Sequence, residues 1–202
     1  MKFATILKSF AAAAIFAAGS SHAATELISN GSFEQNLQAS GTWGIYNNLI
    51  GWHGANKTGI ELRDNVAGSA FDGKNFVELD TTANSSMWQQ VNDVAGKHYT
   101  LSFAFEDRAG VPSSSQGVQV FWGSQNLGVF NNAKEWTIKS FDVLGNQGGT
   151  KLSFFAVGTS DSYGTSIDKV SLTSAVPEPE TYGMLLAGLG LVAFVARRKA
   201  AK

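Results

Sequence analysis

The chain has 202 residues, which allows one domain of ordinary size plus targeting segments. It contains no cysteine, which excludes disulfide bonds, so stability must come from a hydrophobic core or a metal. The formal net charge is −1, but residues 24–176 carry nine basic and fourteen acidic residues, which excludes the basic surface of a nucleic-acid-binding protein. With 22 glycines and only 3 prolines, the composition favours an all-β domain with many turns.

The first 23 residues have the three parts of a secretory signal peptide. Lys2 and Lys8 precede an apolar run over residues 10–18, and Ser21-His22-Ala23 supplies small residues where signal peptidase cuts. A first transmembrane helix is the alternative, but the apolar run is short for one. We therefore expect export through the Sec machinery, with cleavage after Ala23.

Residues 24–175 contain short strand-like runs separated by Gly, Asn, Asp and Ser, with no repeat of 20–50 residues and no long helical pattern. The clearest run is 98–106, where aromatic and leucine side chains alternate with polar ones. In 135–144 the apolar positions change parity, which predicts a bulge. The expected strands are 26–29, 43–46, 49–53, 59–63, 75–80, 87–91, 98–106, 117–122, 126–130, 135–144, 151–157 and 166–173. This spacing predicts a β-sandwich or barrel.

Several stretches of this body carry a family resemblance. The first reads Leu-Ile-Ser-Asn-Gly-Ser-Phe-Glu, and the others are 51–52, 72–79, 89–91, 96–103 and 167–172. They resemble the galactose-binding-domain-like jelly roll of many carbohydrate-binding modules, and the bacterial relatives of the plant cell-wall DUF642 proteins. The resemblance covers about 145 residues and implies an all-β jelly-roll sandwich over residues 24–175.

The same resemblance implies a structural calcium ion between the first and last strands, which lie close together in such modules. Glu34 and Asp168 stand at the matching positions. Calcium takes six to eight oxygen ligands, and backbone carbonyls can complete the set. The alternative is that Glu34 caps a turn and Asp168 accepts hydrogen bonds from backbone N–H groups.

Sugar-binding sites need flat aromatic faces beside groups that hydrogen-bond to hydroxyls. The candidates are Trp43, Tyr46, Trp88, Gln90 and Trp122. Trp88 and Gln90 are expected to face solvent, because they alternate with more apolar neighbours on the same strand. Packing in the core is the alternative for any one of the tryptophans.

Catalytic residues are not predicted. The carboxylate pairs Glu106–Asp107 and Glu78–Asp80 do not by themselves provide the separation that a glycosidase needs. There is no Gly-x-Ser-x-Gly elbow, and the histidines lack the spacing of metal ligands.

The C-terminal segment begins with Val176, Pro177, Glu178 and Pro179, continues with the uncharged residues 181–196, and closes with a basic cluster of Arg197, Arg198 and Lys199. Sixteen helical residues span roughly 24 Å, short of a bilayer core of about 30 Å. A buried core helix is therefore the alternative. The basic cluster favours a membrane span instead, because its side chains can snorkel and hold the tail 197–202 in the cytoplasm. The sequence predicts a single transmembrane helix, N-terminus out and C-terminus in.

This order of parts resembles the PEP-CTERM sorting signal of Gram-negative bacteria, with residues 176–180 as the motif. In that family the signal is read by exosortase, a membrane transpeptidase-like enzyme that is expected to cleave near the motif, and the family is associated with bacteria that make exopolysaccharide and biofilms or flocs. The resemblance implies exosortase and the inner membrane as partners.

Together these features predict an exported protein that is held at the inner membrane and then reaches the cell surface or extracellular matrix. Its body is expected to bind polysaccharide, such as the producer's own exopolysaccharide or biofilm matrix, without catalysis. A structural matrix protein without a specific ligand is the first alternative, and a polysaccharide-acting enzyme is the second.

Overall fold

The computed structural model describes residues 24–55, 57–174, 183, 185–190 and 197. The predicted signal peptide, the four residues of the sorting motif, Arg198 and Lys199 lie outside the described residues, as does most of the predicted transmembrane helix. Gly183, residues 185–190 and Arg197 are helical. Within the described part of the chain, no helix is both long and apolar enough to cross a membrane.

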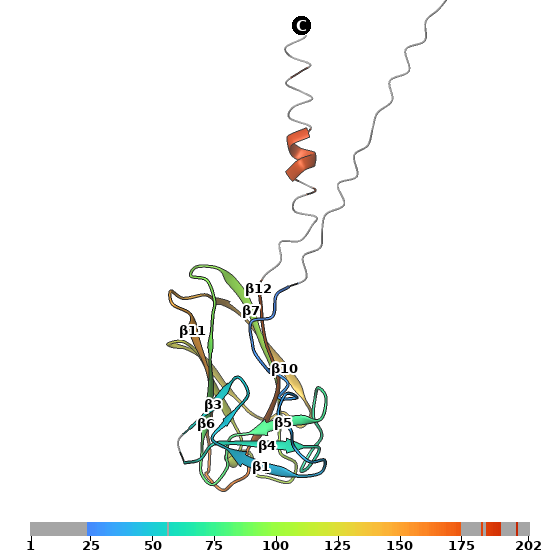
Figure 1. The fold of residues 1–202 in the computed structure, drawn as a ribbon, viewed down its shortest axis with the longest axis vertical. Coiled ribbons are helices and arrows are strands. Elements are labelled where there is room, and N and C mark those ends of the chain that lie inside the picture. The colour runs from blue at the N-terminus through green and yellow to red at the C-terminus, as the bar shows by residue number, and fades with distance from the viewer. Residues whose placement is uncertain (1–23, 56, 175–182, 184, 191–196, 198–202) are drawn as a thin grey trace, which may run out of the picture. The chain divides into compact units, whose positions relative to one another are not determined.

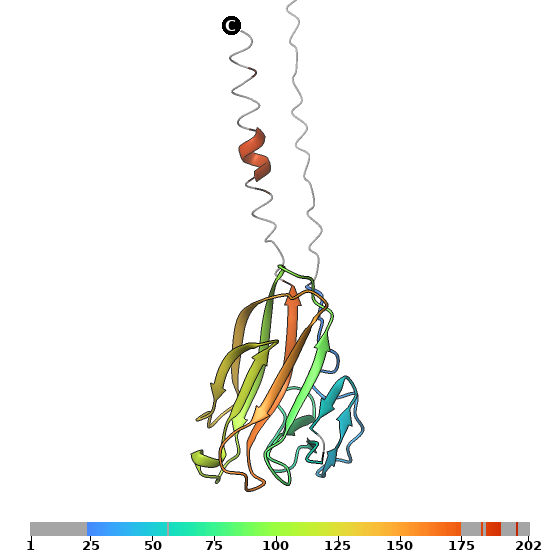
Figure 2. The same ribbon diagram turned by 90° about the vertical axis from the view of Figure 1, so that its left-hand side faces the viewer.

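The body is a β-sandwich, as the sequence predicts. Its described residues form two six-stranded antiparallel sheets, which face one another in Figure 1, and Figure 2 looks onto the second. Sheet A has the order β1 (Trp43–Tyr46), β4 (Ile60–Asp64), β5 (Asn75–Glu78), β12 (Thr165–Ser174), β7 (His98–Asp107), β10 (Thr137–Leu144). Sheet B has the order β2 (Asn48–Leu49), β3 (Trp52–Gly54), β6 (Ser86–Val91), β11 (Thr150–Ala156), β8 (Val118–Trp122), β9 (Gln125–Phe130). A single 3-10 turn, Ser113–Ser115, precedes β8.

The core fills the space between the two sheets. In β7, Tyr99, Leu101, Phe103 and Phe105 are buried, as their alternation predicts. The Phe103 ring meets the Phe154 ring of sheet B edge to face, with centroids 5.3 Å apart. Each such side chain contributes about 1.5–3 kcal/mol on burial, which lets the domain fold without disulfide bonds.

The first predicted strand, 26–29, is not a strand. Glu26 makes only an isolated bridge with Thr173, and the Leu27 N–H donates to the Leu172 carbonyl at 2.9 Å. The reason is local: the Glu26 carboxylate accepts the N–H of Ile28, which diverts that backbone group from a ladder. The segment nevertheless lies against the last strand, as the family resemblance implies.

The bulge predicted in 135–144 is also wrong. β10 pairs with β7 in unbroken register from Thr137 to Leu144. The apparent change of parity arises because Ile138, an apolar residue, points outward and is 54% exposed. Register shifts lie instead in β12, after Asp168, where Lys169 has a φ of 47°, and between β8 and β9, after Val120.

Candidate functional site

The outer face of sheet A, turned away from the core, carries an unusual set of side chains. Trp43 on β1 stands directly opposite Arg63 on β4, and Arg63 stands opposite Phe76 on β5. Two residues further along the same pair of strands, and on the same face, Glu61 of β4 stands opposite Glu78 of β5. Because side chains alternate along a strand, these residues point away from the apolar neighbours that fill the core. An indole, a guanidinium and two carboxylates thus share one surface.

The charged members of this surface form a buried network. Arg63 Nε lies 2.7 Å from Glu61 Oε1, and Arg63 Nη1 lies 2.8 Å from Glu78 Oε2. Arg108 Nη1 lies 3.8 Å from the same Glu78 oxygen. Arg63 and Glu78 are almost completely excluded from water. Two cations and two carboxylates therefore balance one another beneath the surface.

Glu78 is the least satisfied member of the network. The Arg63–Glu78 pair is close but poorly aligned, so among the described residues neither Glu78 side-chain oxygen has a hydrogen-bond partner. Burial raises the pKa of Glu78 to about 7, although Arg63 pulls the pKa down, and the neighbouring Glu61 raises it further.

A cavity of about 400 Å³ opens above this network, and we call it the Trp43 groove. Trp43 and Tyr163 stand at its walls with 57% and 46% of their surface exposed, and Glu61, Arg63 and Arg108 also line it. The Arg108 guanidinium lies over the Tyr163 ring, 4.5 Å from its centroid. Exposed aromatic rings beside fixed polar groups are the elements of a sugar-binding site.

The remaining wall comes from the loop 65–74, which two carboxylates hold in place. Asp168 Oδ2 accepts the N–H groups of Phe71 and Asp72, both at 2.8 Å. Glu34 Oε1 accepts those of Lys74 and Asn75, at 2.8 and 2.6 Å. Burial raises the pKa of Asp168 to about 7, against the opposing effect of these hydrogen bonds.

Glu34 and Asp168 are thus brought to the same loop, but as acceptors of backbone N–H groups. A calcium ion needs six to eight oxygen ligands in place of such donors. Among the described residues, no three carboxylate, histidine or cysteine side chains gather into a metal-binding group. In this arrangement the two residues fit a calcium ion poorly, and calcium binding stays a prediction.

Trp88 lies on the outer face of sheet B, away from the Trp43 groove. Its strand alternates as predicted: Trp88 is partly exposed and Gln90 is exposed, whereas Gln89 is buried with its apolar neighbours. The His53 ring stacks on the Trp88 ring at 4.4 Å, and Lys151 Nζ lies 4.3 Å from its centroid. These two partners come from the strands on either side of β6, so the indole faces are already in contact with protein.

Two other predicted sugar-binding residues lie elsewhere. Trp122 is 2% exposed and donates its indole N–H to the Leu144 carbonyl at 2.7 Å, so it is a core residue with no face for a sugar. Tyr46 is exposed, but it stands opposite Ile60 and so belongs to the other face of β1 from Trp43; its hydroxyl donates to Gln38. Of the five candidates, only Trp43 lines the groove.

Most residues of the Trp43 groove are not predicted from the sequence. The alternation in 60–64 could have placed Glu61 and Arg63 on one outer face. Arg108 and Tyr163 follow β7 and precede β12, and no local pattern indicates that these two loops meet.

The C-terminal residues identify a sorting signal. A protein-family model described as "PEP-CTERM protein-sorting motif" matches residues 175–199. The chain carries a PEP-CTERM motif. This confirms the resemblance on which export and surface sorting were predicted.

The body of this PEP-CTERM-bearing chain is similar to part of two curated proteins, both described as multifunctional-autoprocessing repeats-in-toxin. The protein of Vibrio cholerae serotype O1 is 31% identical over 166 residues, which is 77% of this chain. That of Vibrio vulnificus is 29% identical over 151 residues, or 73% of this chain. The chain spans about 3% of the length of each relative.

Among solved structures, the K2 cleaved adhesin domain of Lys-gingipain has a TM-score of 0.52 at 11% identity, covering 76% of this chain and 99% of that one. TmCBM61 in complex with beta-1,4-galactotriose scores 0.49 at 16% identity, covering 75% and 99%. A family 35 carbohydrate binding module from Clostridium thermocellum scores 0.46 at 16%, covering 66% and 99%. The adhesin domain and this chain share the sandwich fold.

Proposed function

We propose that this protein is exported, sorted to the cell surface by its PEP-CTERM motif, and binds a neutral polysaccharide without catalysis. The observation that carries the binding role is an exposed tryptophan, Trp43, directly opposite a buried arginine, Arg63, on the wall of a cavity. The sorting role rests on the motif at residues 175–199.

The Trp43 groove offers both contacts that a sugar ring uses. The Trp43 ring provides an apolar surface for the C–H face of a pyranose, and Tyr163 stands across the same cavity. Arg108, whose side chain is 21% exposed, donates hydrogen bonds to hydroxyl oxygens, and Glu61 accepts them from hydroxyl hydrogens. The buried Arg63 holds the Glu61 carboxylate in place. Because the buried network fixes these polar groups, little side-chain entropy is lost on binding.

The charges on this face favour a neutral ligand. Both cations of the groove, Arg63 and Arg108, already lie next to Glu78. Arg63 also lies 2.7 Å from the Glu61 carboxylate, so carboxyl groups of the protein already engage the guanidinium groups that a uronic acid would need. The negative net charge of the body acts in the same direction.

The same geometry supports a binding role over hydrolysis. Glu61 and Glu78 stand directly opposite one another on adjacent strands, and Arg63 contacts both. A glycosidase needs two carboxylates that flank the scissile bond from opposite sides of the sugar. A pair held side by side by one arginine does not provide this arrangement.

Delivery in this proposal follows the order of parts in the chain. The signal peptide directs export, the apolar segment 181–196 holds the chain in the inner membrane, and exosortase processes the motif before the body reaches the cell surface or matrix. The polysaccharide of the producer's own matrix is then the ligand within reach. A matrix protein without a specific ligand is the alternative that a binding experiment decides.

The test is electrophoresis of the full chain through gels that contain galactan, mannan or β-glucan, with polygalacturonate as the acidic comparison. We expect at least one neutral glycan to retard the protein. Trp43→Ala should weaken that binding about tenfold or more, as loss of a central aromatic contact does. The matched control is Trp88→Ala, which removes an indole from the other sheet and should bind like wild type.

Two results would contradict the proposal. If no neutral glycan retards the wild-type protein, the ligand-free alternative holds. If Trp88→Ala abolishes binding and Trp43→Ala does not, the site lies on sheet B. Equal melting temperatures of the two variants and the wild type ensure that the comparison reports binding and not unfolding.

A further inference from the structure

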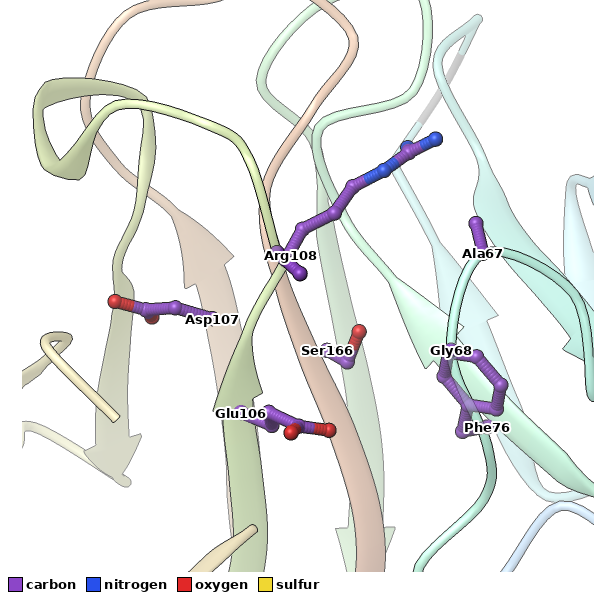
Figure 3. Close-up of a pocket in the computed structure, with 8 residues that line it drawn as sticks. Ala67, Gly68, Phe76, Glu106, Asp107, Arg108 and Ser166 are labelled. Atoms are coloured by element: carbon purple, nitrogen blue, oxygen red, sulfur yellow. The ribbon is translucent and has the colours of Figure 1, made fainter. Parts of the chain in front are cut away.

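A second cavity, of about 390 Å³, adjoins the Trp43 groove on the same face of sheet A. It is lined by Phe76, Glu106 and Ser166, and it shares Ala67 and Arg108 with the groove (Figure 3). Two cavities that share walls on one surface can be occupied by one continuous ligand.

The strand order gives the length of this surface. Trp43 is on β1, and Glu106 is on β7, four strand spacings away across β4, β5 and β12. Neighbouring strands lie about 4.8 Å apart, so the surface extends for about 19 Å. That length exceeds a single sugar ring and accommodates several linked rings.

The second cavity has the chemistry to hold a sugar. The Ser166 hydroxyl and the Glu106 carboxylate reach toward the space beside the Phe76 ring (Figure 3). Asp107 points away, where it accepts hydrogen bonds from the Asn132 N–H and the Thr165 hydroxyl. Glu106 is partly exposed, and its carboxylate can accept hydrogen bonds from sugar hydroxyls, whereas Phe76 and Ser166 are buried and form the floor of the cavity.

Glu106 also sets the charge of this end. Burial raises its pKa first, and the nearby carboxylates of Glu135 and Asp107 raise the pKa further. A negatively charged sugar would add to this repulsion, whereas a neutral sugar would not. The chemistry of the second cavity therefore agrees with that of the Trp43 groove.

Arg108 stands where the two cavities meet. Its guanidinium is held between the Tyr163 ring and the Glu78 carboxylate, 4.5 Å from the ring centroid and 3.8 Å from the oxygen. The guanidinium has five N–H donors, and among the described residues its one carboxylate contact is that distant Glu78 oxygen, so it can donate to sugar rings on both sides.

We propose that the Trp43 groove continues past Arg108 into this second cavity, the Glu106 subsite, and that the ligand is a run of several linked neutral sugars. This inference rests on the proposed function, since it extends the same binding surface. It assigns Glu106 as a ligand contact and makes chain length the property that the protein recognises.

The test is calorimetric titration of the full chain with β-1,4-linked galacto-, manno- and gluco-oligosaccharides of one to six units. For the series that binds, we expect no measurable affinity for the monosaccharide and a gain of about tenfold or more between two and five units. Glu106→Ala should weaken binding of the pentasaccharide about tenfold and leave that of the disaccharide unchanged. Glu135→Ala, which removes a neighbouring carboxylate that does not line the cavity, is the matched control and should match wild type for both.

The outcomes separate this inference from the proposed function. If disaccharide and pentasaccharide bind equally, or if Glu106→Ala leaves pentasaccharide binding intact, the Glu106 subsite is wrong, while loss of binding in Trp43→Ala still supports the groove. If no oligosaccharide of any length binds, both proposals fail. Should Glu106→Ala lower the melting temperature, Glu106→Gln, which keeps the shape of the side chain, replaces it.

Discussion

At the scale of single residues, Glu78 has the most unusual environment. Glu78 is fully buried, although it lies on the outer face of sheet A, which solvent would ordinarily reach. One of its oxygens lies 2.8 Å from Arg63 Nη1 and 3.8 Å from Arg108 Nη1. Burial still dominates, and the pKa of Glu78 is raised to about 7. A buried carboxylate of this kind costs stability when it is charged, even with a partner, because water solvates the charge better.

This environment predicts that the protein is more stable in mild acid. The folded state holds the Glu78 proton up to about pH 7, whereas the unfolded chain releases it near the ordinary glutamate pKa of 4.5. The free energy of unfolding therefore falls as the pH rises from about 4.5 to 7, by up to about 3 kcal/mol. Asp168, whose pKa rises from 3.8 to about 7, acts in the same direction. Thermal melting at pH 5 and pH 8 should give the higher Tm at pH 5.

Glu78→Gln is the informative variant for this prediction. The amide keeps the size of the side chain and does not titrate, so the difference in Tm between pH 5 and pH 8 should shrink. If the variant keeps the full pH dependence, Glu78 is not its source. Glu135→Gln, at an exposed carboxylate for which the described residues show no ion pair, serves as the control for general charge effects.

At the scale of elements, the loop 65–74 is held against its own backbone preferences. Asn65 and Ala67 have φ values of 47° and 56°, a region that an alanine rarely occupies. The four N–H bonds to Glu34 and Asp168 offset that strain. Since Ala67 lines both cavities, the two carboxylates also shape the binding surface.

Asp168→Ala should therefore destabilise the protein by about 2–4 kcal/mol, because it leaves the N–H groups of Phe71 and Asp72 without an acceptor. Asp168→Asn keeps an acceptor oxygen and should cost less. Melting curves measure both, and limited proteolysis should cut Asp168→Ala first within 65–74. If Asp168→Ala has the same Tm as the wild type, the Asp168 carboxylate does not hold the loop 65–74 in place.

The same melting experiment decides the calcium prediction. Because the Glu34 and Asp168 carboxylates already have N–H partners, we expect chelator and added Ca²⁺ to give the same Tm. A Tm that falls by several degrees with chelator and recovers with Ca²⁺ would establish a cation at these residues.

Strands could be predicted from the sequence where burial imposes a period of two. β7 was predicted almost to its ends because its aromatic and leucine side chains alternate over the whole strand. Segment 26–29 is too short to show such an alternation, and its own glutamate diverts the backbone. The exposed Ile138 produces the change of parity that predicts a bulge in 135–144. The sequence alone does not show which apolar residues remain exposed to solvent.

The site was less predictable than the strands. Trp43 was recognised as a candidate because tryptophan is a common sugar contact. Trp122 was included for the same reason, and only the fold shows that it is buried. Arg108 and Tyr163 are 55 positions apart in the chain and meet because β7 and β12 are neighbours in sheet A. Such contacts follow from the order of the strands in the sheet. Residue types and their spacing within a short segment do not predict that order.

At the scale of the whole molecule, a β-sandwich is combined with a C-terminal sorting signal. The motif begins at residue 175, directly after β12 ends at Ser174. The sandwich residues 24–175 form one compact unit. The sorting motif therefore begins at the residue that follows the last strand of the sandwich.

The double substitution Pro177→Ala, Pro179→Ala should prevent normal delivery. Proline fixes φ and has no N–H, so replacing both prolines changes the backbone that a processing enzyme would read. Fractionation of the producing cells should show the variant retained in the inner membrane while the wild type reaches the surface. Normal surface delivery of the variant would contradict the role of the motif. Thr173→Ala, just before the motif, is the control.

The position of β12 has a mechanical consequence. β12 lies inside sheet A, between β5 and β7, and the first segment of the body is bonded along its end through Glu26 and Leu27. Antiparallel hydrogen bonds run across the strands, so a pull along β12 from the C-terminal side loads many of them in shear at once. The Trp43 groove lies on the same sheet. If the C-terminus is attached and a glycan chain is bound, tension between them would therefore be carried by sheet A. The force would act along the strands, where many hydrogen bonds must break together before the sheet separates.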